Sequence, residues 1–233
     1  MLQSLTRAVG QSFDPAFRRV FFRSFMASFA TYILVWLGSW LLFGWLGGLL
    51  EGWFETVDLW EWLETSLIFL FKAGGFATLI IASLFVFPAI MVAIMSLFLE
   101  EIAEAVEAEH YPNLGEARKP SISENIRSGL AFAAVTLGLN ILVLPFYLIP
   151  IINIVVFIAL NGYLLGREYF ELVGLRRSTP GDTKKLRNQR SGRVLTAGAI
   201  IAFLFAIPLV NLAAPIIATA FMLHIFEGVR QKA

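Results

Sequence analysis

Four long stretches with almost no charged side chains constrain the fold of this chain more than any other feature. They are residues 25–50, 65–99, 129–166 and 194–226, and Lys72 is the charged residue that interrupts the second stretch. A helix of about 20 apolar residues crosses the hydrocarbon core of a bilayer, which is about 30 Å thick. Inside that core, an α-helix satisfies every backbone hydrogen bond within one segment. The sequence therefore predicts an all-α integral membrane protein.

The composition agrees with this class and argues against an enzyme. Hydrophobic residues make up 58% of the 233 residues and charged residues 15%, whereas a soluble domain is closer to half apolar and a quarter charged. The absence of cysteine excludes disulfides, thiolate metal sites and a cysteine nucleophile. His110 and His224 lie too far apart in sequence to suggest a metal site. We expect no catalytic residues, no metal and no cofactor.

The polar segments between the apolar stretches set the predicted topology, which treats residues 1–233 as a single membrane domain. The N-terminal segment has no short apolar core with a cleavage site and is not expected to be a signal peptide. The predicted order is a cytoplasmic segment 1–24, a first span 25–50, an external loop 51–64, a second span 65–99 that kinks at Pro88, a cytoplasmic amphipathic segment 100–128, a first hairpin 129–166, a basic cytoplasmic loop 167–193 and a second hairpin 194–226.

Basic residues orient the chain in the membrane. Of the 18 Lys and Arg residues, all except Lys72 fall on one side of this arrangement, and the 51–64 loop contains acidic residues alone among its charges. Because basic residues concentrate in cytoplasmic loops, both termini are predicted to be cytoplasmic. The basic loop lacks the interleaved aromatic residues of a nucleic-acid surface, so no nucleic-acid partner is expected.

The last two apolar stretches each contain a central turn with proline and asparagine but no charge. Residues 148–153 and 206–211 both place Ile-Pro, two aliphatic residues and Asn in the same order. Apolar turns are unusual at a membrane surface, and the ascending arm 194–207 is too short to cross the bilayer. We therefore predict two hemi-penetrating hairpins in addition to two long transmembrane helices. Two full, tightly turned hairpins remain the alternative, and residues 129–149 alone are long enough to span.

The order and spacing of several segments resemble the CysZ sulfate permease family, whose domain also occurs in a eukaryotic etoposide-induced membrane protein. The resemblance is clearest in Pro120-Ser121-Ile122, the first Ile-Pro turn, Gly166-Arg167-Glu168-Tyr169, the arginine-rich stretch 187–193 and the second Ile-Pro turn. It implies sulfate uptake across a bacterial inner membrane for cysteine biosynthesis, with the two-helix, two-hairpin architecture and homo-oligomeric assembly. Ile94-Met95-Ser96 stands where the family often has Pro-Phe-Asn, which allows for a related oxyanion.

The start of the first long helix is the predicted anion site. Asp14 followed by Pro15 is a typical helix start, where free N–H groups attract anions. The family's Gly-Leu-Arg-Arg sulfate motif resembles Ala16, Phe17, Arg18 and Arg19, with alanine in place of glycine. The alternative is that these arginines extend to lipid phosphates.

Three further residues are candidates for an anion pathway: Lys72, Asn153 and Asn211. Lys72 alternatively extends to the outer interface, and the two asparagines alternatively cap the hairpin turns. The alternative for the whole chain is a non-transporting membrane scaffold or stress-response protein with the same domain.

Overall fold

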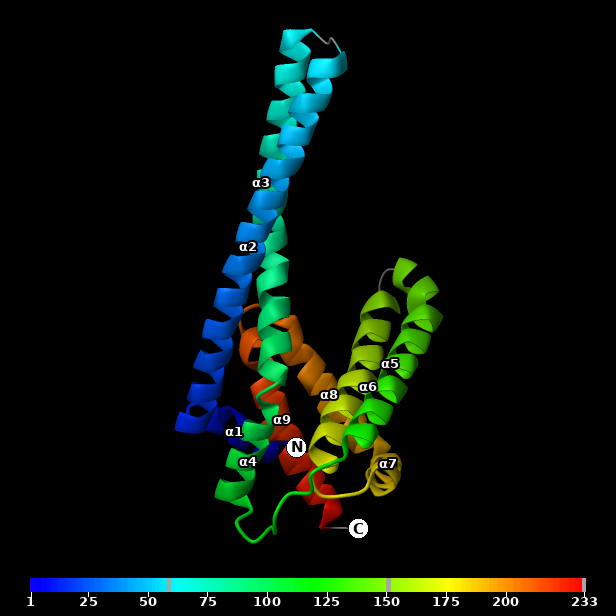
Figure 1. Cartoon of the computed structure of the whole chain (residues 1–233). Coiled ribbons are helices and arrows are strands. Elements are labelled where there is room, and N and C mark those ends of the chain that lie inside the picture. Colours follow the sequence, from blue (N-terminus) through cyan, green and yellow to red (C-terminus); the bar gives the residue numbers. More distant parts are fainter. Residues whose placement is uncertain (58–59, 150–151, 232–233) are drawn as a thin grey trace. The chain divides into compact units, whose positions relative to one another are not determined.

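A computed structural model describes residues 1–57, 60–149 and 152–231, and every regular element in these residues is helical (Figure 1). In chain order these are α1 (Leu2–Gln11), α2 (Pro15–Val57), α3 (Glu61–Ser96), α4 (Leu99–His110), α5 (Ile122–Val143), the 3-10 helix η1 (Leu144–Leu148), α6 (Ile152–Gly174), α7 (Pro180–Gln189), α8 (Ser191–Ala206) and α9 (Val210–Arg230). The all-helical class predicted from the apolar stretches is confirmed for this part of the chain.

In the part of the chain that the structure describes, four helical segments are long and apolar enough to cross a bilayer. They are Pro15–Phe54, Glu61–Ser83, Ile126–Leu148 and Val210–Arg230. A fifth results if the bent pair Val86–Ser96 and Leu99–His110 counts as one span, and Ser191–Ala206 is a shorter apolar helix. This arrangement is that of a membrane protein with several spans.

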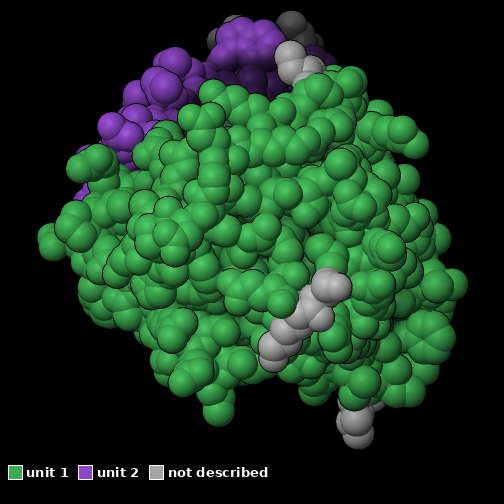
Figure 2. Space-filling model, turned by 90° about the horizontal axis from the view of Figure 1, so that it is seen from below, with its two compact units in different colours: residues 1–21, 97–233 green, residues 22–96 purple. Residues whose placement is uncertain are grey.

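The chain forms two compact units, shown in different colours in Figure 2. Unit 1 contains Met1–Phe21 and Leu97–Ala233, and unit 2 contains Phe22–Ser96. The N-terminal segment is thus part of the same unit as the second half of the chain. Unit 1 contains the predicted anion site.

In unit 2, two long helices pack along each other through aromatic side chains. Trp40 meets Phe76 edge to face with ring centroids 6.2 Å apart, and Phe43 lies against Phe71 at 6.0 Å. The segment predicted as an external loop, 51–64, is largely helical, because α2 continues to Val57 and α3 begins at Glu61. Two acidic residues in the first turn of α3 favour that helix start, since they complement the helix dipole.

The region predicted as a kinked second span and an acidic extension divides into two helices. Pro88 lies inside α3, which ends at Ser96, and α4 begins after a short break. The apolar face predicted for the acidic stretch is confirmed: Leu99, Ile102, Ala103 and Val106 are all buried, while the glutamates between them are mostly exposed. Helical spacing places these four residues on one face, which covers the core of unit 1.

The core of unit 1 is organised around α9. This helix contacts α1, α4, α6 and α8, and it is buried almost continuously from Ala214 to Glu227. A helix that is apolar on all sides belongs inside a protein or a membrane. Here neighbouring helices of the same unit cover it.

Glycines bring α6 and α8 into very close contact. A Cβ atom built at Gly198 would lie 1.9 Å from the carbonyl oxygen of Gly162 and 2.5 Å from the backbone nitrogen of Gly166. Gly162 and Gly166 are four residues apart, the small-residue spacing that lets helix backbones approach in membranes. Any side chain at Gly198 would push the two helices apart.

The two apolar turns differ in what can be described. Pro150 and Ile151 of the first turn lie outside the described residues. In the second, Ile207, Pro208 and Leu209 alone join α8 to α9, and Leu209 has a φ of 68°. This left-handed conformation is costly for a residue with a side chain. The tight connection therefore stores backbone strain in an apolar turn.

Candidate functional site

The candidate anion site lies where α2 begins. The helix starts at Pro15 as predicted, and the Arg18 backbone N–H donates to the Asp14 carbonyl oxygen at 3.0 Å. Proline suits the first helical position because it has no N–H group that would go unpaired there. The N–H groups of Ala16 and Phe17 follow in the first turn, where helix N–H groups have no partner within the helix. The local sequence thus presents backbone donors next to two arginines.

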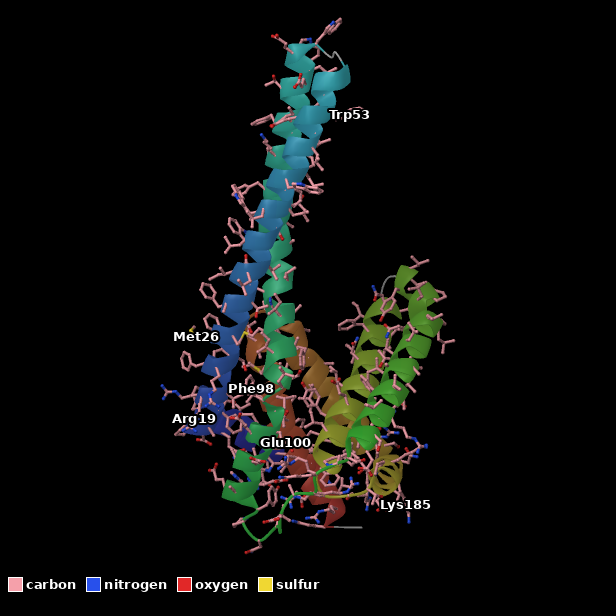
Figure 3. All side chains as sticks on the ribbon, viewed as in Figure 1. Arg19, Met26, Trp53, Phe98, Glu100 and Lys185 are labelled. Carbon is pink, nitrogen blue, oxygen red and sulfur yellow. The ribbon has the colours of Figure 1, made fainter. Side chains whose placement is uncertain are left out.

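A cavity of about 500 Å³ opens beside this helix start. Its walls are formed by Asp14, Pro15, Ala16, Phe17, Arg19, Ala105 and Glu109. Arg19 lies near the start of α2 (Figure 3) and lines the cavity, whereas Arg18 lies outside the cavity wall, and both side chains are exposed. Phe17 is 2% exposed, so its side chain anchors the helix start in the core. The cavity therefore combines three of the four predicted residues, Ala16, Phe17 and Arg19.

Two carboxyl groups share this cavity with Arg19. Partial burial raises the pKa of Asp14 above its ordinary value, and the nearby Glu109 carboxylate raises it further. A carboxylate disfavours a neighbouring anion and favours protonation of a neighbouring acid. The cavity wall therefore contains one basic and two acidic side chains.

A buried polar network beside the cavity joins α1 to α4, α9 and the residue that follows α4. The Tyr111 hydroxyl lies 2.9 Å from Nδ1 of His224, whose Nε2 lies 3.3 Å from the Gln11 side-chain oxygen. Gln11 Nε2 lies 3.1 Å from a Glu109 carboxylate oxygen and from His110 Nδ1. The network links Glu109, in the cavity wall, to the centre of unit 1.

The two histidines meet in this network, which the sequence did not indicate. Their ring centroids are 5.0 Å apart and their planes are steeply inclined. Proximity comes from the packing of α4 on α9, so no local spacing signals it. Among the described residues, no group of three or more His, Cys, Asp or Glu side chains could hold a metal ion.

A second charged cluster fixes the end of α6 to α4. Arg176 and Arg177 both bind the Glu107 carboxylate, at 3.0 and 2.6 Å, and all three side chains are less than 10% exposed. Burial raises the pKa of Glu107, but the hydrogen bonds from Arg177 and Arg176 outweigh it and hold the pKa below its ordinary value. This cluster holds the base of unit 1 together.

The three candidate pathway residues have the following surroundings. Lys72 Nζ lies 2.6 Å from Glu51 Oε1, and both side chains are substantially exposed, so the pair is held only weakly. Backbone N–H groups of Asn153 and Asn211 donate to the carbonyls of Ile149 and Ile207 at 3.0 Å. The buried Asn211 Oδ1 has no partner among the described residues, and the first turn, which Asn153 was expected to cap, includes residues 150 and 151, which lie outside them.

The fold defines a multi-pass helical membrane protein, and the start of α2 places an arginine and two acidic residues around one cavity. The chain belongs to the sulfate transporter CysZ/etoposide-induced protein 2.4 family, which matches residues 4–215. The description of that family names a sulfate transporter and an etoposide-induced protein, and no enzyme. The match covers the helix start and most of both hairpins. A search of curated proteins found no match.

Proposed function

We propose that this chain is a sulfate permease of a bacterial inner membrane, with both termini in the cytoplasm, that supplies sulfate for cysteine biosynthesis. The main support for this proposal is the family match over residues 4–215, which includes the arginine-containing start of α2. The basic residues on the side of the termini support this orientation, because such residues concentrate in cytoplasmic loops.

In this proposal the anion is bound without a metal or cofactor. Backbone N–H groups of Ala16 and Phe17 donate to sulfate oxygens, Arg19 supplies the charge inside the cavity, and Arg18 extends to the ligand from the neighbouring position. The planar guanidinium groups match two oxygens of a tetrahedral anion. Selectivity then depends on charge and fixed donors.

The proposed permeation route uses hemi-penetrating hairpins. The 16 residues of α8 cover only about 24 Å as a helix, less than the thickness of the hydrocarbon core. Polar backbone at the apolar turns needs protein or water around it, so a homo-oligomer is proposed to enclose the route. Lys72, Asn153 and Asn211 are the proposed contacts along it.

Sulfate entry into a negative interior requires a driving force. Moving one charge against the membrane potential costs about 2.3 kcal/mol per 100 mV, and sulfate carries two charges. The proposal therefore includes coupling to a favourable gradient, such as rapid use of sulfate inside the cell.

A second candidate is a membrane scaffold or stress-response protein that does not transport. The observation that favours it is the pair of acidic residues, Asp14 and Glu109, in the wall of the anion cavity. Two carboxylates facing one arginine oppose the binding of a dianion. The two candidates differ in whether the purified protein binds sulfate.

Sulfate affinity measured by calorimetry tests the proposal. Replacing both Arg18 and Arg19 by Ala removes two charge-assisted partners, each worth about 1.5–3 kcal/mol, so affinity should fall at least about tenfold. Arg19→Ala alone should cost more than Arg18→Ala, because Arg19 lines the cavity. Asp14→Asn should strengthen binding by removing a repelling carboxylate.

The matched control removes two exposed basic residues elsewhere, Lys185→Gln with Arg190→Gln, and should leave sulfate affinity within about twofold of wild type. Wild-type affinity in the Arg18/Arg19 double variant would contradict the proposed site. A wild-type protein that does not bind sulfate would favour the scaffold.

A further inference from the structure

A second, larger cavity lies between α5, α6 and α7, away from the start of α2. Its volume is about 700 Å³, and α5 and α6 run side by side with α7 at their lower end (Figure 1). The charged residues in its wall are Arg127, Arg167, Lys184, Arg187, Glu124 and Glu171. Basic side chains outnumber acidic ones, which is unlike the cavity at Arg19.

Two helix caps hold the walls of this cavity in place. At the start of α5, the Glu124 backbone N–H donates to Ser121 Oγ at 3.2 Å, and the Ser121 N–H donates to the Glu124 carboxylate at 3.0 Å. At the start of α7, Thr179 Oγ1 accepts from the Asp182 N–H at 3.2 Å. Such caps stabilise helix ends because they pair backbone N–H groups that have no partner within the helix. The caps fix the positions from which Arg127 and Lys184 project.

Both acidic residues in the wall already have basic partners. Arg118 Nη2, which is not part of the cavity wall, lies 2.6 Å from each Glu124 carboxylate oxygen. On α6, Arg167 Nε lies 3.0 Å from Glu171 Oε1, which also accepts from Arg187. The Glu171 carboxylate is thus shared between the guanidinium groups of Arg167 and Arg187, and the basic side chains of the cavity wall are not fully neutralised.

Arg127 and Lys184 carry the remaining positive charge. Neither has a hydrogen bond or an ion pair among the residues that the structure describes, and both line the cavity. Arg167 and Arg187 lie beside them and are almost buried, with side-chain exposures of 10% and 12%. Arg127 and Lys184 are exposed, and Arg167 and Arg187 share the single carboxylate of Glu171, so the cavity favours an anionic partner.

An apolar groove continues directly from the charged cavity. It has a volume of about 370 Å³ and shares Val135 and Tyr163 with the charged cavity. Its other walls are Leu139, Val143, Val156, Ala159 and Leu160, which face one another along α5 and α6. No charged residue lines this part, so the combined site is basic at one end and apolar along the other.

We propose that this site binds an anionic phospholipid. The headgroup phosphate lies between Arg127 and Lys184, with Arg167 and Arg187 behind it, and one acyl chain lies in the groove along Val135, Leu139 and Val143. A free oxyanion would use the charged end alone, whereas a lipid matches both ends. Basic pockets between membrane helices bind anionic headgroups for the same reason.

The test compares two lipids on the intact protein in mild detergent. Native mass spectrometry measures binding of phosphatidylglycerol and of phosphatidylcholine with the same acyl chains. Phosphatidylglycerol should bind at least about tenfold more tightly, because the choline cation is repelled by the basic residues. Equal binding of the two lipids to the wild-type protein would overturn the proposal without any variant.

Three variants assign the binding to this site. Arg127→Gln with Lys184→Gln should lower phosphatidylglycerol affinity at least about tenfold, whereas the control pair Lys185→Gln with Arg190→Gln, of the same charge change but outside the cavity wall, should change it less than about twofold. Val135→Trp fills the groove and should also weaken binding. Equal losses in the two charge pairs would indicate general surface attraction and overturn the proposal.

Competition separates the lipid from a free anion. Inorganic phosphate or sulfate at millimolar concentration should fail to displace phosphatidylglycerol, because neither occupies the groove. Displacement by the free anion, with no effect of Val135→Trp, would instead make this an oxyanion site. Arg18 and Arg19 variants should leave lipid binding unchanged, so this result and that of the sulfate site can be told apart.

Discussion

At the scale of single residues, unit 1 depends both on neighbours in the chain, such as Asp14 and Pro15, and on side chains that helix packing brings together, such as His110 and His224. Asp14 followed by Pro15 predicted the start of α2, because a proline at the first helical position is a short-range preference. The meeting of His110 with His224 depends on how α4 packs on α9, and no spacing in the sequence encodes it. Ala16, Phe17 and Arg19 line one cavity, and nothing in the sequence indicated Glu109 in its wall, because Glu109 belongs to α4, which is far away in the sequence.

Glu107 should be a major stabilising residue of unit 1. Glu107→Gln removes the carboxylate that Arg177 binds and leaves Arg176 with the exposed Glu100, at 2.8 Å, as its close charged partner, so stability should fall by about 3 kcal/mol. Glu104→Gln is the matched control on the same helix, because that side chain is 65% exposed and lies 3.9 Å from Arg176, and it should cost less than about 1 kcal/mol. Denaturant unfolding in detergent measures both, and equal effects would contradict this role.

The same residue predicts a response to acid. The folded-state pKa of Glu107 lies below the ordinary value of 4.5, so its stabilisation is fully present above about pH 4.5 and is lost as the pH falls through the folded pKa. Wild-type stability should therefore decrease below pH 4.5, and Glu107→Gln should flatten this decrease. An unchanged pH dependence in the variant would show that other groups control it.

At the scale of elements, apolar periodicity predicted the helices better than their ends. The buried face of α4 was confirmed residue by residue, since spacing alone defines it. The segments 51–64 and 167–193, which were expected to be loops, contain helix. Charged residues occur both in loops and on exposed helix surfaces, so a charged composition does not distinguish a loop from an exposed helix. The close contact of α6 and α8 was missed, although Gly162 and Gly166 show the four-residue spacing that indicates it.

The α6–α8 contact predicts a strong effect of one methyl group. Gly198→Ala places a Cβ atom against the backbone of Gly162 and Gly166, which cannot move aside as a side chain would, so stability should fall by about 3 kcal/mol. Gly192→Ala, in the same helix with nothing within 4 Å of the new atom, should be neutral or slightly stabilising. Thermal unfolding in detergent compares the pair, and a neutral Gly198→Ala would show that the helices are further apart.

The hemi-penetrating hairpin predicts a labelling pattern in this cysteine-free chain. A cysteine at Leu209, in the turn between α8 and α9, should resist an impermeant thiol reagent added outside, because a turn within the bilayer is not reached from there. A cysteine at Glu61, at the start of α3, should be labelled readily under the proposed topology. Labelling of Leu209→Cys to the level of Glu61→Cys would favour a full span.

At the scale of the whole molecule, the chain combines a membrane fold of known family with a proposed passage for sulfate. The family match covers most of the chain, and the four long apolar helices found among the described residues agree with a protein of several spans. The distribution of basic residues along the sequence predicted the orientation of the chain in the membrane, but it could not predict which basic side chains lie close together. Arg19 lies in a cavity with acids, whereas Arg127 and Lys184 lie in one that is mainly basic. These two environments assign the proposed substrate and the proposed lipid to different places.

Sulfate flux into liposomes tests the central claim most directly. Purified wild-type protein, reconstituted with an inward sulfate gradient, should accumulate radiolabelled sulfate well above protein-free liposomes. The Arg18→Ala, Arg19→Ala double variant should lose most of this uptake at low sulfate concentration, while Lys185→Gln with Arg190→Gln retains it. Wild-type uptake no faster than that of empty liposomes, in protein shown to be folded, would contradict the permease and support the membrane scaffold.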